Sequence, residues 1–152
     1  MTCYLVRHGE AKPEAEDPQR PLTEHGESQV EKVARAALAR GIRAAEIWHS
    51  DKLRAKQTAE ILARHLSSPN SLREVSGLAP EDDPILAQAE LEAAVDQVMV
   101  VGHLPHLSRL ASLLISGDPE KRRIDFPTAA IVCLQREADQ WKIEWILAPD
   151  RA

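Results

Sequence analysis

The sequence predicts an α/β fold, a three-layer α/β/α sandwich around a mainly parallel sheet with an antiparallel edge. Three observations carry this prediction. Short apolar runs alternate along the chain with segments of helical periodicity. Residues 98–101 are apolar without a break, which is typical of a strand covered on both faces. The chain then closes with two strand-like runs separated by a short turn.

The first elements lie before residue 45. Residues 3–6 form an apolar run that predicts a strand, and residues 11–21, dense in proline and charge, predict a surface loop. Thr23 is a good helix N-cap, and Gly41 is typical of the position just after a helix. Apolar side chains recur at helical spacing between them, so we expect the first helix there.

The middle of the chain continues the alternation of strand and helix. Residues 46–49 predict a second strand, and Ser50 is expected to be the N-cap of a second helix that extends to about Leu66. A short strand is predicted over residues 72–75. A proline at the start of residues 84–94 predicts a third helix there.

The last third of the chain completes the sheet. Residues 98–101 are expected to form the central strand. A fourth helix is predicted to open at Pro105 and to stop at Gly117. Residues 129–134 and 141–147 predict the two closing strands.

Composition limits the classes of function. A chain of 152 residues fits one domain, which we expect to span residues 1–152. The net charge of −5 argues against a nucleic-acid partner, and no run reaches the ~20 apolar residues of a membrane span. Cys3 and Cys133 lie in apolar runs without metal or redox spacing, which predicts buried thiols and a cytoplasmic protein.

Polar side chains follow three of the predicted parallel strands where each strand ends. Arg7 and His8 follow the first strand, residues 50–54, including Arg54, follow the second, and His103 follows the unbroken apolar strand. Ligands of open α/β sheets bind outside the carboxyl ends of the strands. We therefore expect these side chains to share one site.

Two arginines and two histidines in one place favour a tetrahedral dianion, because the forked guanidinium donors match phosphate oxygens. A neutral His8 can attack phosphorus and form a phosphoenzyme, while a protonated His103 would stabilise the developing charge. Activity should then have a bell-shaped dependence on pH. Since these residues could supply the charge that Mg²⁺ supplies elsewhere, we expect no metal and no cofactor.

Four sequence elements resemble the histidine phosphatase superfamily and come in the family's order. They are LVRHGEA at 5–11, RPLTEHG at 20–26, SDKLRAKQTA at 50–59 and VGHLPH at 101–106. The short chain and the spacing are similar to the SixA-type phosphohistidine phosphatases. The resemblance implies the phosphoglycerate mutase-like fold of this superfamily in one compact domain, without the large inserted cap of the mutase branch.

The resemblance also implies roles for individual residues. His8 matches the phosphorylated nucleophile, and His103 matches the second active-site histidine. Arg7 and Arg54 match the phosphate-binding arginines. A further basic residue at the mouth of SixA-type sites is matched by Arg20, with Asp17 three positions before it as an auxiliary residue.

Two departures from the family pattern stand out. Asp51 follows Ser50 where many members have proline. Many members also carry an acidic proton donor between the second arginine and the second histidine; the candidates here are Glu81, Asp82 and Asp83, and Glu81 is kept as an auxiliary candidate. An imidazole leaving from an N–P bond needs less protonation than an alkoxide, for which general acid catalysis contributes ~10²–10⁴ in rate.

Three functions stay open at this point. The first is hydrolysis of phosphohistidine on a protein such as a histidine-containing phosphotransfer domain. The second is hydrolysis of a small phosphomonoester by the same mechanism, and the third is a phosphoprotein-binding module without turnover. The sequence does not fix the oligomeric state, and a monomer is compatible with it.

The remaining histidines receive other interpretations. His25, His49 and His65 are interpreted as surface or helix-end residues. His106 lies three positions after His103, a spacing that can hold zinc, but the sequence offers no third ligand. We therefore predict no metal site.

Overall fold

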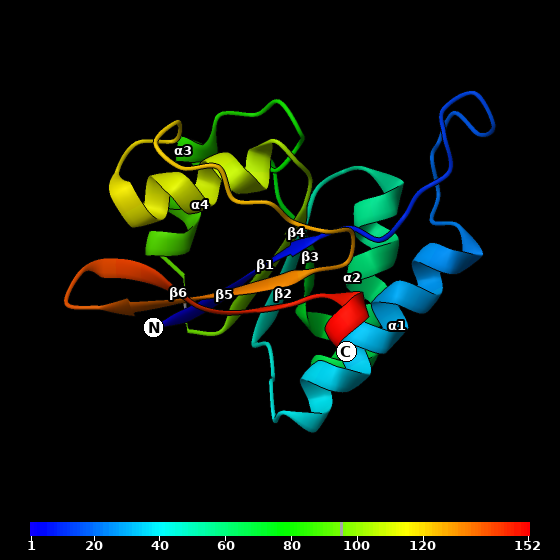
Figure 1. Ribbon diagram of the computed structural model, residues 1–152, viewed down its shortest axis with the longest axis horizontal. Helices are drawn as coiled ribbons and strands as arrows, with labels where there is room; N and C mark the ends of the chain where they lie inside the picture. The colour runs from blue at the N-terminus through cyan, green and yellow to red at the C-terminus, as the bar shows by residue number, and fades with distance from the viewer. Residues whose placement is uncertain (95) are drawn as a thin grey trace.

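The computed structural model of the protein describes residues 1–94 and 96–152 (Figure 1). Six strands of these residues form one sheet in the order β3-β2-β4-β1-β5-β6. Their bounds are β1 Thr2–Arg7, β2 Glu46–His49, β3 Leu72–Glu74, β4 Val98–Gly102, β5 Ile131–Glu137 and β6 Gln140–Leu147. The first four strands pair in parallel, and β5 and β6 add an antiparallel edge beside β1. The predicted sheet is confirmed.

Four α-helices in the described residues cover the sheet. They are α1 Glu24–Ala39, α2 Leu53–Leu66, α3 Pro84–Glu92 and α4 His106–Ser116, with short 3₁₀ turns at Pro69–Ser71 and Pro149–Arg151. Figure 1 shows α1 and α2 on one face of the sheet and α3 and α4 on the other. None of the helices in the described ranges has the length and apolar character to cross a bilayer.

The central strand β4 shows why both faces need helices, since all its residues are buried. Met99 and Val101 pack in the cluster that contains the apolar stripes of α1 and α2. Val98 and Val100 pack in the opposite cluster, with α3 and α4. Side chains of a strand point alternately to its two faces, so a strand apolar at every position requires a three-layer sandwich.

Several predicted boundaries are confirmed. Thr23 is the N-cap of α1 and accepts a hydrogen bond from the backbone N–H of Gly26. Gly117 ends α4 with a φ of 81°, a left-handed conformation that glycine adopts without steric cost. Both cysteines are buried and free, as predicted.

Other boundaries differ from the prediction. Ser50 is not a helix N-cap, because α2 begins at Leu53 after Lys52. Likewise Pro105 precedes α4 as its N-cap rather than forming its first turn. The strand predicted over 129–134 begins only at Ile131.

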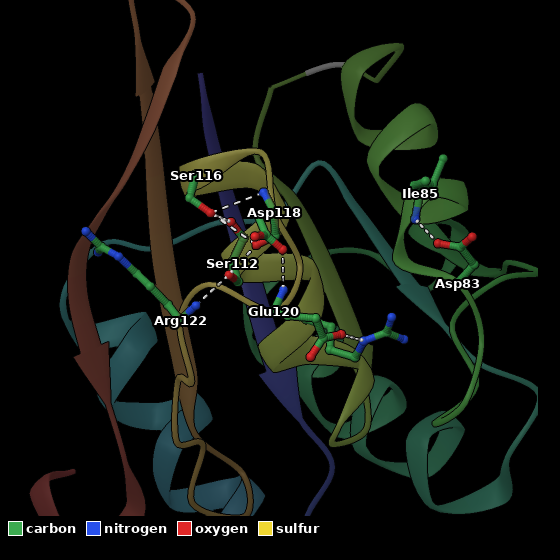
Figure 2. A network of polar contacts seen from close by, with 8 residues as sticks. Asp83, Ile85, Ser112, Ser116, Asp118, Glu120 and Arg122 are labelled. Atoms are coloured by element: carbon green, nitrogen blue, oxygen red, sulfur yellow. Dashed lines mark hydrogen bonds and ion pairs between the residues drawn. The ribbon is translucent and has the colours of Figure 1, made fainter.

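Serine side chains of α4 hold the connection to β5 against the helix (Figure 2). The buried Ser112 hydroxyl donates to the carbonyl of Asp118 at 2.6 Å and accepts from the backbone N–H of Arg122 at 3.0 Å. One turn later, the Ser116 hydroxyl lies 2.7 Å from the Ser112 carbonyl and 3.1 Å from the Asp118 carbonyl, so its single hydrogen is within reach of both acceptors. The segment 117–126 is therefore a strap fixed to α4.

The strap reaches the carboxyl edge of the sheet. Ser108 accepts a hydrogen bond from the backbone N–H of Ile124 at 2.9 Å. Two residues later, the carbonyl of Phe126 accepts a hydrogen bond from Nη1 of Arg7 at 2.8 Å. A segment held by one face of the sandwich thus orients a side chain at the end of β1.

Candidate active site

His8 follows the last residue of β1 and is held between two neighbouring strands. Its backbone N–H donates to the carbonyl of Gly102 at 3.1 Å, and its carbonyl accepts from the backbone N–H of Ala129 at 3.1 Å. The side chain is buried, with 8% of its surface exposed. The parallel strands β1 and β4 pair Arg7 with Gly102, so His8 and His103 are the next residues in register.

The hydrogen bond of the His8 ring fixes its tautomer. Nδ1 lies 2.7 Å from the carbonyl oxygen of Gly9, and a carbonyl can only accept, so Nδ1 carries the proton. Nε2 then keeps a lone pair. Burial lowers the pKa of His8 to about 4, against the opposing effect of the Gly9 carbonyl and with help from the charge of Arg54. The ring is therefore neutral at pH 7, as a nucleophile requires.

The backbone after His8 packs too tightly for a side chain. A Cβ on Gly9 would lie 2.8 Å from the carbonyl oxygen of Gly26 and 2.8 Å from Cγ2 of Val30. The N–H of Gly9 donates to the Thr58 hydroxyl at 3.1 Å, and that hydroxyl donates to the carbonyl of Arg54 at 2.8 Å. These hydrogen bonds connect the backbone that follows His8 to the first turns of α2.

His103 faces His8 from the end of β4, with 5.1 Å between the ring centroids. The ring is almost completely buried. Burial and then the charges of His8 and Arg54 lower the pKa of His103 to about 3. The expectation of a protonated His103 is therefore wrong for the chain by itself. A phosphate dianion beside the ring would oppose this shift by Coulomb attraction.

Ser50 belongs to the cluster predicted at this edge of the sheet, but its predicted role as a helix N-cap differs from its place in the site. Its hydroxyl lies 2.6 Å from Nε2 of His103, and the side chain is 1% exposed. Its position directly after β2, at the same sheet edge as the histidines, is the signal that predicts it in this cluster.

The two predicted phosphate-binding arginines lie beside the histidine pair. The charges of Arg54 and Arg7 both act on His8. Nε of Arg7 and Nε of Arg54 are buried without a hydrogen-bond partner in the described residues. Buried polar atoms are normally hydrogen-bonded, so these donors suit an anion that the site would bind.

Arg20 reaches the same site from the loop before α1. Its backbone has a φ of 50°, and its Nε donates to the carbonyl of Lys12 at 3.0 Å. With Arg54 it lines a hollow of about 520 Å³. Asp17 contributes to the loop instead: its carboxylate accepts from the backbone N–H of Gln19, and its carbonyl accepts from that of Arg20.

Of the three acidic candidates, Asp82 lines a hollow with Ser50, whereas Glu81 and Asp83 are exposed. Asp83 caps α3 by accepting from the N–H of Ile85. Asp82 accepts from the N–H of Ala79 and lines a hollow of about 280 Å³ that also contains Ser50 and Glu74. Glu74, at the carboxyl end of β3, was not considered from the sequence, although a carboxylate ending a predicted parallel strand is the relevant signal.

His25, His49 and His65 lie outside the pair formed by His8 and His103. His49 is buried, so its interpretation as a surface residue is wrong; its Nδ1 donates to the Ser50 carbonyl at 2.8 Å. His65, partly buried on α2, pairs with Glu31 at 2.8 Å, and His25 is exposed. In residues 1–94 and 96–152, no three His, Cys, Asp or Glu side chains are grouped to hold a metal.

Comparison with known proteins decides the family. The family model for the histidine phosphatase superfamily (branch 1) matches residues 3–79. The chain belongs to this superfamily. An uncharacterized protein of Picosynechococcus sp. is 40% identical to it over 124 residues, which cover 77% of this chain and 74% of that protein.

Solved structures of phosphatases share the fold of this histidine phosphatase. The protein histidine phosphatase SixA complexed with tungstate superposes with a TM-score of 0.88 at 29% identity, covering 99% of this chain and 98% of the other. A mycobacterial glucosyl-3-phosphoglycerate phosphatase superposes with a TM-score of 0.70 at 16% identity, covering 95% and 97%. The second likeness shows the fold alone. The protein is a phosphatase, and the phosphoglycerate mutase-like fold implied by its motifs is confirmed.

Proposed function

We propose that this phosphatase hydrolyses phosphohistidine on a protein, through a phosphoenzyme formed on His8. One observation carries the proposal: the His8 ring is neutral, has its proton on Nδ1, and presents the Nε2 lone pair among the charges of Arg7 and Arg54. Phosphoryl transfer depends mostly on positioning and on charge stabilisation, and this arrangement supplies both without a metal.

The first step transfers the phosphoryl group to the protein. Nε2 of His8 attacks phosphorus, and an N–P bond forms as the N–P bond to the substrate imidazole breaks. The leaving nitrogen takes a proton from solvent. Arg7, Arg54 and Arg20 hold the phosphoryl oxygens, and His103 stabilises the charge that develops on them.

The second step regenerates the protein. Water attacks phosphorus, an O–P bond forms, and the N–P bond to His8 breaks, which returns the electron pair to Nε2. The proton lost by the water balances the proton taken up by the first leaving group. The net reaction is phosphohistidine plus water giving histidine plus inorganic phosphate.

A protein substrate is favoured by the likeness to SixA, described as a protein histidine phosphatase, over nearly the full length of both chains. We propose that residues 1–152 act as one domain in the cytoplasm, on a phosphorylated partner such as a histidine-containing phosphotransfer domain. Such a site needs no cofactor and no general acid for its imidazole leaving group.

The test is single-turnover phosphate release from a phosphorylated histidine-phosphotransfer domain in excess EDTA. We expect rapid release by the wild type and an acid-labile phosphoenzyme, and neither from His8→Ala. His25→Ala, which changes an exposed histidine, is the matched control. Unchanged phosphohistidine in the presence of wild type would refute the proposal.

A small phosphomonoester is the second candidate substrate, favoured by the hollow that Glu74 and Asp82 share with Ser50. An ester needs a proton donor for its alkoxide, and a carboxylic acid there could provide it. A sharp loss of ester hydrolysis in Glu74→Gln or Asp82→Asn would favour this candidate, with Glu81→Gln as the exposed control. Unchanged ester hydrolysis in all three variants would count against it.

A further inference from the structure

The hydroxyl of Ser50 has a restricted choice of hydrogen-bond partners. It lies 2.6 Å from Nε2 of His103, and its oxygen accepts from the backbone N–H of Lys52 at 3.2 Å. Among the described residues, Nε2 is the one acceptor within reach of the hydroxyl hydrogen. If Nε2 donated instead, that buried hydrogen would lack an acceptor, at a cost of about 1–3 kcal/mol.

We infer that Ser50 is a positioning residue that donates to Nε2 of His103 and thereby holds the neutral ring in the tautomer protonated at Nδ1. Nδ1 is buried without a partner in the described part of the chain. As an N–H group it would donate to a phosphoryl oxygen, whereas a bare Nδ1 would direct a lone pair at a dianion. The inference rests on the proposed function, because it assigns the Nδ1 proton to the phosphoryl group transferred there.

Ser50 lies between two parts of the proposed phosphate site, the His103 ring that it contacts and Arg54 in α2. It follows β2 directly, and Arg54 lies four residues later in the first turn of α2. A change at Ser50 therefore has two effects. It releases the His103 ring, and it removes the acceptor for the Lys52 N–H, so the experiment must separate ring orientation from a local shift of the helix start.

The tautomer is measured directly by long-range ¹H–¹⁵N NMR of the His103 ring at pH 7 in the full chain. Ionisable groups that act on this ring come from several elements: His8 after β1, Lys52 and Arg54 at the start of α2, and His106 in α4. We expect Nδ1 to be protonated and Nε2 bare in the wild type. Ser50→Ala should shift both nitrogens toward a mixture of tautomers, and Ser50→Thr, which keeps the hydroxyl, should restore the wild-type pattern.

Activity provides the second readout. In metal sites, loss of the hydrogen bond that orients a ligating histidine costs about 10-fold to 100-fold in activity, and we expect a factor of similar size for an oriented histidine here. We expect Ser50→Ala to lose that factor in kcat for phosphohistidine hydrolysis and Ser50→Thr to recover most of it. Ser71→Ala is the matched control, because Ser71 is also buried and its hydroxyl donates to the Ser68 carbonyl before β3, at the opposite end of the strand from the site.

Two results would overturn the inference: a wild-type His103 ring protonated at Nε2, or nitrogen shifts and kcat in Ser50→Ala equal to those of the wild type. A wild type without phosphatase activity on phosphohistidine would instead refute the proposed substrate. The NMR comparison would then still decide the tautomer.

Discussion

His8 and His103 lie at equivalent places in the sheet, yet their rings have different kinds of hydrogen-bond partner. Each directly follows a parallel strand, and the pairing of Arg7 with Gly102 puts the two in register. His8 bonds a backbone carbonyl, which can only accept, whereas His103 bonds a serine hydroxyl, which can also donate. The His8 ring is therefore held with its proton on Nδ1, as the proposed nucleophile, and we propose the His103 ring as a hydrogen-bond donor.

Removal of His8 should have the largest effect. His8→Ala takes away the nucleophile, and loss of a nucleophile in other hydrolases costs more than ~10⁴-fold in kcat. We expect no phosphoenzyme in a quench experiment with a phosphorylated histidine-phosphotransfer domain. A phosphoenzyme of wild-type amount in His8→Ala would assign the nucleophile to another side chain.

Removal of His103 should have a smaller effect, because in the proposed mechanism this ring stabilises charge and forms no bond to phosphorus. Loss of one such donor typically costs about 10²–10³-fold in kcat. His103→Ala should therefore still form the phosphoenzyme, more slowly than the wild type. Pre-steady-state quenching measures this rate. Losses of equal size in His8→Ala and His103→Ala would contradict the proposal that the two rings have different roles.

The sequence predicts the residues of this site that lie in contiguous sequence motifs. Arg7 ends β1, His8 and His103 each follow a strand, and Arg54 lies in the first turn of α2. Local pattern and the carboxyl-edge rule therefore predict that these side chains meet. Local pattern predicts Ser50 only as a helix cap, because its partner His103 lies 53 residues away in the sequence. Only the fold reveals that partner.

Long-range contacts explain the other differences as well. The Phe126 carbonyl that orients Arg7 lies 119 residues from it, on a strap without a recognisable motif. The charge state of His103 depends on its burial and on positive charges from other elements. The spacing of residues in the sequence does not predict how these effects combine. The helix after β2 also begins later than predicted: α2 begins at Leu53, and the Ser50 oxygen accepts from the backbone N–H of Lys52 before the helix.

The shared burial of the two rings predicts how stability depends on pH. The pKa is lowered to about 4 in His8 and to about 3 in His103, so below pH 6.5 the unfolded chain takes up protons that the folded chain does not. The free energy of unfolding should therefore fall as pH falls from 6.5, by at most about 1.4 kcal/mol per pH unit for each ring. The burial of His106 lowers its pKa and acts in the same direction.

Urea unfolding at pH 7.0, 6.0 and 5.0 measures this slope. His8→Ala removes one of the titrating rings and should flatten the dependence, while His25→Ala, at an exposed position, should keep it. An equal slope in wild type and His8→Ala would show that the His8 ring titrates alike in the folded and unfolded chains.

The smallest expected effect comes from the strap, which supports Arg7 from a distance. Ser112→Ala leaves the Arg122 N–H without its acceptor. A fully buried unsatisfied group costs ~1–3 kcal/mol, and this contact is only partly buried. The Ser116 hydroxyl still lies within reach of the Asp118 carbonyl, so we expect a loss toward the lower end of that range and a kcat within about threefold of the wild type. Urea unfolding beside Ser28→Ala, a change at an exposed helix position, measures the first quantity. A large loss of kcat in Ser112→Ala would mean that Arg7 depends on the whole strap, and not only on the Phe126 carbonyl at its end.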